Sequence, residues 1–534
     1  NKEAVLIDNC TRKEMEKSFE IQGVMGRSQI KESCDSTIEI AERCSGWSLE
    51  EVREEGILPG PKTIRVGKKE FNLVDDQQDQ FALEALCKEG WDRLGLDKKK
   101  NVKKYRARLE MELGAIETQG FVRYFLLIID LIRKVKERGI LVGPGRGSVT
   151  ASIVSWLTGI TAIDPVEQGL LFFRFINPDR IHPPDIDMDF QSDRRDEVYD
   201  ILKDTYGENK AFRISNFSIL RGRAAIRDVA RTFGVPPYEV DKITPLIIIR
   251  GGTGDSRRSF TVEDSINEFK EVGDFFRKYE EVKLSLRLEG QVRHKAVHAC
   301  GIVVSDDKPM WAYAPIELRK AGGGDKEWTP VICLDYRDSE WMGLLKIDAL
   351  GLSTLEIIKK CLDNIFDQKG ETIDLEKNPF KDKRVLAEFR SGNTTGSFQF
   401  DTRCLRKLGM QIQPRDYKAL VDANALHRPG ALFSGVASQY MRRYRGIEPV
   451  TFDHPVLEKF TKQTQGCCIY QEQIMQLCVN MAGFTWPEAD EVRHEISKKG
   501  GIEAVDRQSG KWFEGCKARN VPDKTAKFVW NMIR

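Results

Sequence analysis

Three aspartates, Asp185, Asp187 and Asp189, occupy alternate positions in an otherwise apolar stretch. In a β-strand, residues i and i+2 point to the same face, so a strand here would project the three carboxylates together. Like charges repel, and a buried carboxylate is costly unless it is paired or bound to a metal. Hard divalent ions relieve this repulsion, and carboxylate oxygens suit Mg²⁺. The pattern predicts a divalent-cation site, with an edge strand whose acidic face lies in water as the alternative.

Two further segments carry groups that suit phosphate chemistry. Asp348 lies in an apolar, strand-like run with Lys346 two residues earlier on the same face. Such a pair is usually a structural salt bridge, and its other role is a third metal ligand beside a phosphate-neutralising lysine. A glycine-rich turn ends at Gly147 and Ser148, before an apolar stretch from about Val149 that is expected to be helical. Backbone N–H groups at a helix start bind phosphate oxygens, although such turns are more often only structural.

Together these segments fit one chemistry. Two neighbouring carboxylates plus a third from another strand can hold two metal ions about 3.5–4 Å apart, which clamps the attacking and leaving oxygens of phosphoryl transfer. The anion site at the helix start would hold a triphosphate. These residues favour nucleotidyl transfer by two metal ions.

A resemblance to a known family covers nearly the whole chain. It is carried first by residues 143–190, GPGRGSVTASIVSWLTGITAIDPVEQGLLFFRFINPDRIHPPDIDMDF. This run closely resembles the palm of bacterial replicative DNA polymerase III alpha subunits, the C-family DNA polymerases. Further matches follow in the family's order: IRDVAR (226–231), VHACGIVVS (297–305), GLLKIDALGL (343–352), SFQFD (397–401), HRPG (427–430), YQEQIMQ (470–476) and ADEVRHEISKKG (489–500). Departures at His427, Ala431 and His494 indicate a divergent member.

The resemblance implies specific site residues. Asp185, Asp187 and Asp348 would be the catalytic triad that holds two Mg²⁺ ions, with Asp189 as a neighbour of open role. The incoming nucleotide would be bound by Gly147, Ser148, Arg174, Arg180, Lys346, Arg493, Lys498 and Lys499. Arg428 and Tyr470 lie in matching finger motifs.

The resemblance also implies a multidomain α/β protein. Its palm would have the mixed sheet of a polymerase beta-like nucleotidyltransferase, with a largely helical thumb and fingers. The expected parts are the end of a polymerase and histidinol phosphatase-like domain (1–54), the palm in two pieces (55–216 and 290–353), an inserted thumb (217–289) and truncated fingers (354–534). The chain starts at Asn1 and ends in an amphipathic stretch, so we expect a fragment cut at both ends.

The periodicity of apolar residues predicts the helices and strands of the chain. Helical periodicity covers 13–29, 36–44 and most of 80–139, with Gly139 or Gly143 as the stop. Charged helical segments flank a loop at 251–254. Strand-like runs return at 300–305, 330–334 and 344–347, and the chain is mainly helical from about 354.

Charge does not by itself identify a partner, because 84 Lys and Arg oppose 82 Asp and Glu. One local basic run holds Lys98, Lys99, Lys100, Lys103, Lys104, Arg106 and Arg108. Arg223, Arg227 and Arg231, four residues apart, would form one stripe on a helix. A solvated helix face is the alternative for both, and we prefer it for the lysine run. A polymerase thumb grips phosphates without reading sequence, which favours the arginine stripe as a DNA-binding surface.

The twelve cysteines are scattered without a C-x-x-C pair, which fits a reducing cytoplasm. The longest apolar run, 124–131, is too short to span a bilayer, and no signal peptide opens the chain. The six histidines do not cluster, and for His298 a satisfied core role is expected. We therefore expect a protein of the bacterial cytoplasm, or a phage-encoded one acting there.

The expected function is template-directed DNA polymerisation in replication: deoxynucleotides are added to a primer 3′ end and pyrophosphate is released. The partners would be primer-template DNA, deoxynucleoside triphosphates and, by resemblance, a sliding clamp and other replisome subunits bound through regions absent from this chain. One alternative is a catalytically silent polymerase-like scaffold that binds DNA, against which the retained aspartates and Lys346 argue. Another is template-independent nucleotidyl transfer, against which the thumb and finger matches argue.

Overall fold

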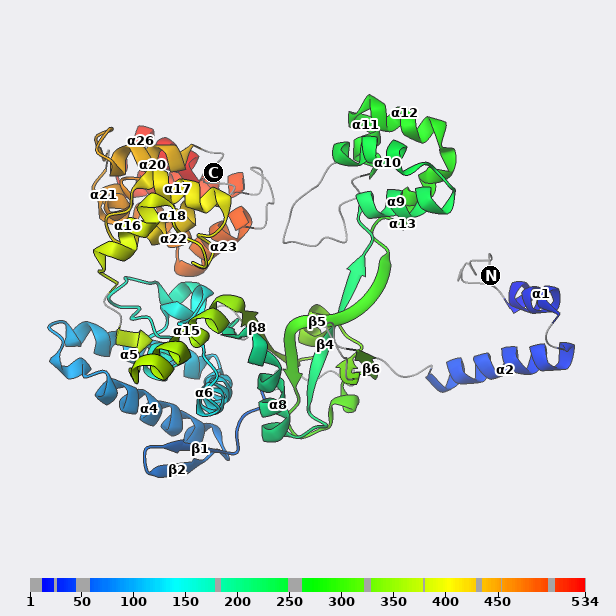
Figure 1. Cartoon of the computed structure of the whole chain (residues 1–534), viewed down its shortest axis with the longest axis horizontal. Helices are drawn as coiled ribbons and strands as arrows, with labels where there is room; N and C mark the ends of the chain where they lie inside the picture. Colours follow the sequence, from blue (N-terminus) through cyan, green and yellow to red (C-terminus); the bar gives the residue numbers. More distant parts are fainter. Residues whose placement is uncertain are drawn as a thin grey trace. The chain divides into compact units, whose positions relative to one another are not determined.

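The computed structural model describes residues 12–23, 26–44, 58–177, 184–247, 262–320, 328–377, 380–428, 435–452, 454–497 and 505–533 (Figure 1). It divides into two compact units, one of Asn1–Gly56 with Trp341–Gly343 and one of the remaining residues. Among the described residues, no helix is long and apolar enough to cross a membrane.

The first unit contains helices α1 (Arg12–Gln22) and α2 (Arg27–Cys44). The expected helical run over 13–29 is interrupted, because the chain turns at Gly23, whose φ of +64° is the left-handed conformation that favours glycine. The second helix therefore starts at Arg27, earlier than the predicted 36.

The second unit opens with a two-stranded hairpin and three helices that bury the largest core. The hairpin is β1 (Thr63–Val66) and β2 (Lys69–Asn72), and the helices are α4 (Asp76–Arg93), α5 (Val102–Thr118) and α6 (Val122–Glu137). The apolar residues of α6, from Phe125 to Ile129, are fully buried among them. The chain leaves α6 at Gly139, with φ of +72°, as the sequence predicts.

A six-stranded mixed sheet follows, in the order β3-β8-β5-β4-β7-β6. Its strands are β3 (Asp187–Gln191), β4 (Ala211–Ile219), β5 (Val292–Val304), β6 (Ile316–Lys320), β7 (Trp328–Ile332) and β8 (Leu345–Leu352). Strands β5, β7 and β8 confirm the three predicted strand-like runs, whereas β4 and β6 were not predicted. Helix α8 (Arg195–Tyr206) links β3 to β4. The predicted mixed α/β architecture is confirmed.

Between β4 and β5 the chain forms a helical group with its own core. It comprises α9 (Gly222–Thr232), α10 (Pro237–Ile243), α11 (Val262–Glu268), α12 (Lys270–Lys278) and α13 (Leu284–Leu288). Buried apolar residues from all parts of this group, among them Ile226, Val272 and Phe276, pack together. The predicted loop at 251–254 lies outside the described residues.

After β8 the described chain is helical, as predicted. The helices are α15 (Ser353–Lys369), α16 (Lys383–Ser391), α17 (Arg403–Ile412), α18 (Tyr417–Leu426), α20 (Val436–Tyr444), α21 (Pro455–Thr461), α22 (Gln471–Ala482), α23 (Trp486–Ser497), α25 (Ser509–Ala518) and α26 (Asp523–Ile533). They surround two cores, one that includes Leu405 and Tyr440 and one that includes Met481 and Trp512.

Helix α4 packs so closely on helix α7 (Ile153–Leu157) that one position between them must be glycine. A Cβ atom at Gly90 of α4 would lie 2.0 Å from the carbonyl oxygen of Leu157. Gly114 of α5 is also helical, but a Cβ there would meet no atom within 4 Å.

This difference predicts opposite effects of the same substitution. Ala gains about 1 kcal/mol over Gly in a helix at either position. At Gly90 the clash should outweigh this gain by separating the two helices, because overpacking costs about 1–3 kcal/mol. Gly90→Ala should lower the midpoint of thermal unfolding and Gly114→Ala should raise it, as measured by calorimetry. Equal shifts of the midpoint would contradict the close packing.

Candidate active site

Strand pairing brings two distant aspartates face to face. Strands β3 and β8 are parallel, and Asp187 lies directly opposite Asp348. Asp185 precedes β3, and the three carboxylates offer oxygens that all lie within 4.8 Å of one another. Asp348 is buried, Asp187 is partly buried and Asp185 is exposed. The structure thus gathers an all-oxygen donor set from the three predicted positions.

The strand itself begins later than predicted, and its third aspartate is turned to another partner. Because β3 starts at Asp187, Asp185 is not part of it. The side chain of Asp189 forms an ion pair with Arg146 of the glycine-rich turn, with 3.2 Å between Nη1 and Oδ1. Asp189, the neighbour whose role the sequence left open, is therefore held by Arg146, and its charge still contributes to the raised pKa of Asp187.

Burial and neighbouring charges perturb Asp187. Burial raises the pKa of Asp187, and the charge of Asp348 raises it further, while Arg146 and Lys346 oppose the rise. The Lys346 ammonium lies 2.7 Å from Asp348 Oδ2. Although burial lowers the pKa of Lys346, its hydrogen bond to Asp348 and the charge of that group raise it overall. Lys346 is the nearest positive charge to Asp348 that the described residues provide.

The glycine-rich turn is attached to the free edge of β3. Gly143 N donates to the carbonyl oxygen of Asp189 at 2.8 Å, and Gln191 N donates to that of Leu141 at 3.2 Å. A Cβ at Gly143 would lie 2.9 Å from the Cβ of Asp189, so only glycine fits this approach. Gly147 lies four residues further along the turn, and a Cβ there would lie 3.8 Å from Asp187 Oδ2. The predicted phosphate-binding turn therefore lies beside the carboxylates.

The helix expected after this turn is broken, which corrects the prediction. Gly147 and Ser148 begin a 3-10 helix, η2 (Gly147–Ala151), and α7 starts separately at Ile153. Ser152 lies between them because its hydroxyl caps Ser155 N and donates to the buried Glu112. Gly147 and Ser148 thus lie on a short 3-10 turn and not at the N-terminus of one apolar helix.

Of the other predicted nucleotide-binding residues, the structure describes two. Arg174 ends the 3-10 helix η3 (Phe172–Arg174) and forms an ion pair with Glu472 of α22. Arg493 of α23 forms an ion pair with Asp490, 2.5 Å apart. Arg180, Lys498 and Lys499 lie outside the described residues, as does Ala431.

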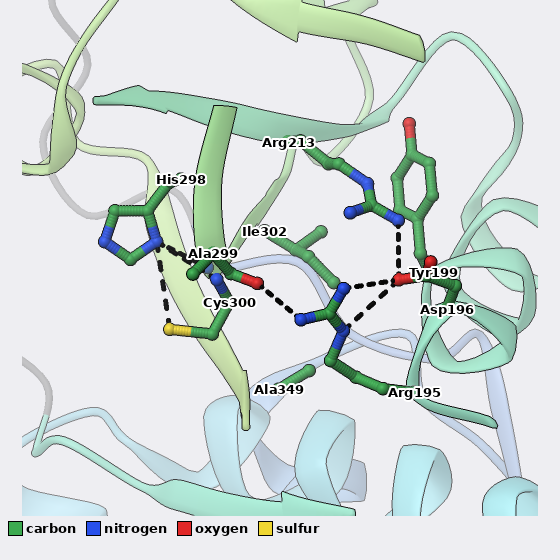
Figure 2. Close-up of a pocket in the computed structure, with 10 residues that line it drawn as sticks. Arg195, Asp196, Tyr199, Arg213, His298, Ala299, Cys300, Ile302 and Ala349 are labelled. Atoms are coloured by element: carbon green, nitrogen blue, oxygen red, sulfur yellow. Dashed lines mark hydrogen bonds and ion pairs between the residues drawn. The ribbon is translucent and has the colours of Figure 1, made fainter. Parts of the chain in front are cut away.

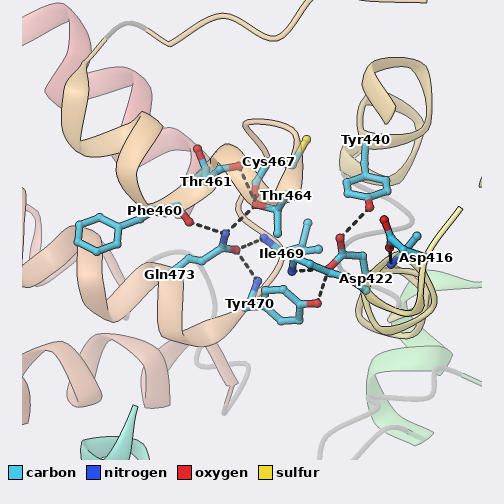
Figure 3. Close-up of polar contacts among 12 residues, drawn as sticks. Asp416, Asp422, Tyr440, Phe460, Thr461, Thr464, Cys467, Ile469, Tyr470 and Gln473 are labelled. Atoms are coloured by element: carbon cyan, nitrogen blue, oxygen red, sulfur yellow. Dashed lines mark hydrogen bonds and ion pairs between the residues drawn. The ribbon is translucent and has the colours of Figure 1, made fainter. Parts of the chain in front are cut away.

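Tyr470 has a structural role that the sequence did not indicate. Its hydroxyl donates to the buried carboxylate of Asp422, which also accepts from Tyr440 at 2.7 Å (Figure 3). The side chain of Gln473 accepts from Tyr470 N at 2.9 Å and donates to Thr464 Oγ1 at 2.7 Å. This network joins α18, α20 and α22. Asp422 resembles any other polar helix residue in the sequence, so only its burial reveals the network.

His298 holds an irregularity in β5 next to the carboxylates. Arg213 of β4 pairs with Ile302, but Ser215 pairs with Val297, so β5 carries extra residues between these pairs. His298 Nδ1 accepts from Gly301 N at 2.8 Å and from Cys300 N at 3.3 Å. Both backbone groups belong to the residues that lack a partner on β4. His298 is therefore satisfied by hydrogen bonds, as expected, but it is only partly buried and does not lie in a core.

Figure 2 shows the pocket on which this irregularity borders. Arg195 spans it, donating to the carbonyl oxygen of Ala299 at 2.9 Å and to Asp196. His298, Cys300 and Asp348 also offer ligand atoms within 4.8 Å of one another. Because His298 Nδ1 already accepts two backbone N–H groups, this second set is less suited to a metal than the three aspartates are.

Each predicted basic surface is paired in part within the protein, while Lys98, Lys100, Lys103 and Lys104 of the lysine run are exposed. Lys99 contacts Asp164 at 2.6 Å, and Arg108 contacts Glu112 at 2.5 Å, so these two side chains of the lysine run point inward. The arginine stripe does lie on a helix, α9. Its Arg223 donates to the carbonyl oxygens of Pro245 and Ile247, and the other two form surface ion pairs: Arg227 with Asp241 and Arg231 with Asp228.

The raised pKa of Asp187 predicts a stability effect. Its folded-state pKa lies above the unfolded value, so the native state loses stability as the pH rises through this interval. Asp187→Asn should therefore raise the midpoint of thermal unfolding at pH 7 in the presence of a chelator. The exposed Asp193→Asn is the control and should not change it. A midpoint lowered by Asp187→Asn alone would contradict the repulsion.

The raised pKa also predicts how the difference in unfolding midpoint between Asp187→Asn and the unaltered protein depends on pH. It should shrink below the ordinary pKa of aspartate, because Asp187 is then protonated in both folded and unfolded states. Mg²⁺ should raise the midpoint of the unaltered protein more than that of Asp187→Asn. The measurement is thermal unfolding as a function of pH and Mg²⁺ concentration. An equal response to Mg²⁺ would show that Asp187 is not a ligand.

Comparison with known proteins gives matches along most of the chain. Residues 81–351 match the family described as bacterial DNA polymerase III alpha NTPase domain. Residues 354–520 match the bacterial DNA polymerase III alpha subunit finger domain.

Curated relatives carry the name DNA polymerase III subunit alpha. The protein of Aquifex aeolicus is 33% identical over 86% of this chain, and that of Halalkalibacterium halodurans is 34% identical over 87%. The Bacillus subtilis protein is 33% identical over 94% of the chain. The matched part is 41%, 40% and 42% of these relatives, so the chain spans about two fifths of their length. The chain belongs to the bacterial DNA polymerase III alpha family.

Proposed function

We propose that the protein is a template-directed DNA polymerase of replication, which adds deoxynucleotides to a primer 3′ end and releases pyrophosphate. The observation that carries this proposal is the register of β3 and β8, which sets Asp187 opposite Asp348 with Asp185 within 4.8 Å. Family membership supports the same activity.

The residues present fit two Mg²⁺ ions. The donor atoms are all carboxylate oxygens, which Mg²⁺ prefers, and the repulsion that raises the pKa of Asp187 is the kind that a cation relieves. Asp185, Asp187 and Asp348 would hold the ions, which supply charge stabilisation for the attacking and leaving oxygens. Lys346 would neutralise phosphate charge next to Asp348.

The nucleotide would lie along the glycine-rich turn. Gly147 and Ser148 would offer backbone N–H groups and a hydroxyl to the triphosphate, and Arg174, Arg180 and Lys346 would add positive charge. Arg493, Lys498 and Lys499 would approach from the helices after β8. Arg174 and Arg493 contact Glu472 and Asp490, so nucleotide binding would exchange a carboxylate for a phosphate at each arginine.

The parts of the molecule would divide the work as in the family. Residues 55–216 and 290–353 would be the palm, 217–289 the thumb and 354–534 the fingers, with 1–54 as the end of a polymerase and histidinol phosphatase-like domain. Primer-template DNA would contact the thumb through its phosphates. A sliding clamp and other replisome subunits would bind through parts of the protein outside this chain.

Asp187→Asn should abolish Mg²⁺-dependent primer extension by the intact protein, because the variant loses one of the metal-binding charges. Binding of primer-template, measured by fluorescence anisotropy, should remain. The control is Asp193→Asn, an exposed aspartate just beyond β3, which should extend primers at the normal rate. Undiminished extension by Asp187→Asn would refute the proposal. Firm DNA binding by the unaltered protein, with no incorporation under any divalent ion, would favour the scaffold alternative.

The arginine stripe predicts a salt effect. Arg227 and Arg231 have 58% and 77% of their side chains exposed, and surface ion pairs of this kind contribute little stability. Arg231→Ala should weaken binding equally for all DNA sequences and reduce the salt slope of log K by about 1. The measurement is a titration with labelled primer-template at several salt concentrations. An unchanged slope would remove Arg231 from the DNA-binding surface.

A further inference from the structure

One face of α5 contacts the two segments that lead to the predicted triphosphate groups. Tyr105, Arg108 and Glu112 follow one another at helical spacing. Tyr105 donates to Asp164 Oδ2 at 2.6 Å. The other two side chains form an ion pair, with 2.5 Å between Arg108 Nε and Glu112 Oε1.

The carboxylate of Glu112 holds the end of the glycine-rich turn. It is fully buried, and its Oε2 atom accepts from Ser152 Oγ at 2.8 Å and from Val154 N at 3.3 Å. These contacts lie where η2 ends and α7 begins. They fix the point from which the turn with Gly147 and Ser148 runs back toward the aspartates.

The guanidinium of Arg108 joins this turn to the second segment. Its Nη2 atom donates to the carbonyl oxygen of Ala151 at 2.6 Å and to that of Leu170 at 3.1 Å. The same guanidinium lies 5.9 Å from the centre of the Phe172 ring. Phe172 starts η3, the short helix that ends at Arg174. One side chain therefore fixes both the turn and the approach to Arg174.

The Arg108–Glu112 pair differs from an ordinary internal salt bridge because its other hydrogen bonds go to two segments outside α5. A buried ion pair can often be replaced by apolar residues without loss of stability. Within the described part of the chain, the other polar contacts of the pair go to residues 151–154 or 170, segments more than thirty residues away from α5 in sequence. The pair thus sets the geometry of these two segments.

We propose that Arg108 and Glu112 are positioning residues for nucleotide binding, which hold the Gly147–Ser148 turn and Arg174 in register with the triphosphate without contacting it. This inference rests on the proposed function. A small displacement of a binding group can reduce the rate by about 100-fold, so loosening this pair should weaken use of the nucleotide while leaving use of the primer-template intact.

The experiment is steady-state primer extension by the intact protein with three variants. Ser152→Ala removes the hydrogen bond to Glu112 together with the cap on Ser155 N, without leaving a charge unpaired. Glu112→Gln removes the charge itself and leaves the cap in place. Glu110→Gln is the matched control, because this glutamate lies on the same helix but is exposed. The two test variants should raise KM for the deoxynucleotide by about 10- to 100-fold, with KM for primer-template unchanged. Glu110→Gln should change neither.

Hydrogen exchange supplies a second readout that needs no activity. Both test variants should speed amide exchange in residues 147–154 and 164–174 but not in β3. Unchanged exchange in these segments, or a KM for the deoxynucleotide equal to that of the unaltered protein, would overturn the positioning role. If the unaltered protein extends no primer, the proposed function fails, and the exchange data alone decide whether the pair positions the two segments. If Glu112→Gln does not fold, the KM for the deoxynucleotide and the amide exchange of Ser152→Ala test the positioning role.

Discussion

The parallel pairing of β3 with β8 is the interaction on which the rest of the site depends. It sets two aspartates directly opposite each other, although their repulsion and burial raise the pKa of Asp187. Neighbouring parallel strands cannot be joined by a tight turn, and here the chain between them forms the other four strands of the sheet and a helical group. The charges are therefore brought together by the folding of the whole sheet, whose core includes Met188, Phe190 and Ile347. Burial of the apolar residues of the same strands offsets the cost of this repulsion.

The edge of β3 that does not face β8 holds the glycine-rich turn in place. A backbone bridge between Val142 and Phe190 fixes where the turn starts, and α5 fixes where it ends through Glu112 and Ser152. With both ends held, the few residues between them have little freedom. The need for Gly143 follows from the Cβ of Asp189, and Gly147 leaves open the space next to Asp187. The turn is thus shaped from two sides by elements that are themselves rigid.

Features that depend on a local residue pattern could be predicted from the sequence. Features that depend on a partner distant in the chain could not. Alternating aspartates in an apolar stretch predicted the carboxylate cluster, and the apolar run around Asp348 predicted its strand. The different role of Asp189 depends on Arg146, and the helix break at Ser152 depends on Glu112, forty residues earlier. The inward turn of Arg108 has the same origin. These three cases concern polar side chains that have partners on another element.

The pairing of the predicted nucleotide-binding cations has a physical consequence for the proposed activity. Among those that the structure describes, Lys346 contacts Asp348, Arg174 contacts Glu472 and Arg493 contacts Asp490. A cleft with three unpaired cations would attract any polyanion, including the phosphates of the DNA itself. The pairs of Arg174 and Arg493 are partly exposed, and ion pairs near water have small net energies, so a triphosphate could replace the carboxylate at these two arginines with little loss. Such pairing would make strong binding depend on a ligand that engages several of these cations at once, which a triphosphate held along the glycine-rich turn would do and a single backbone phosphate would not.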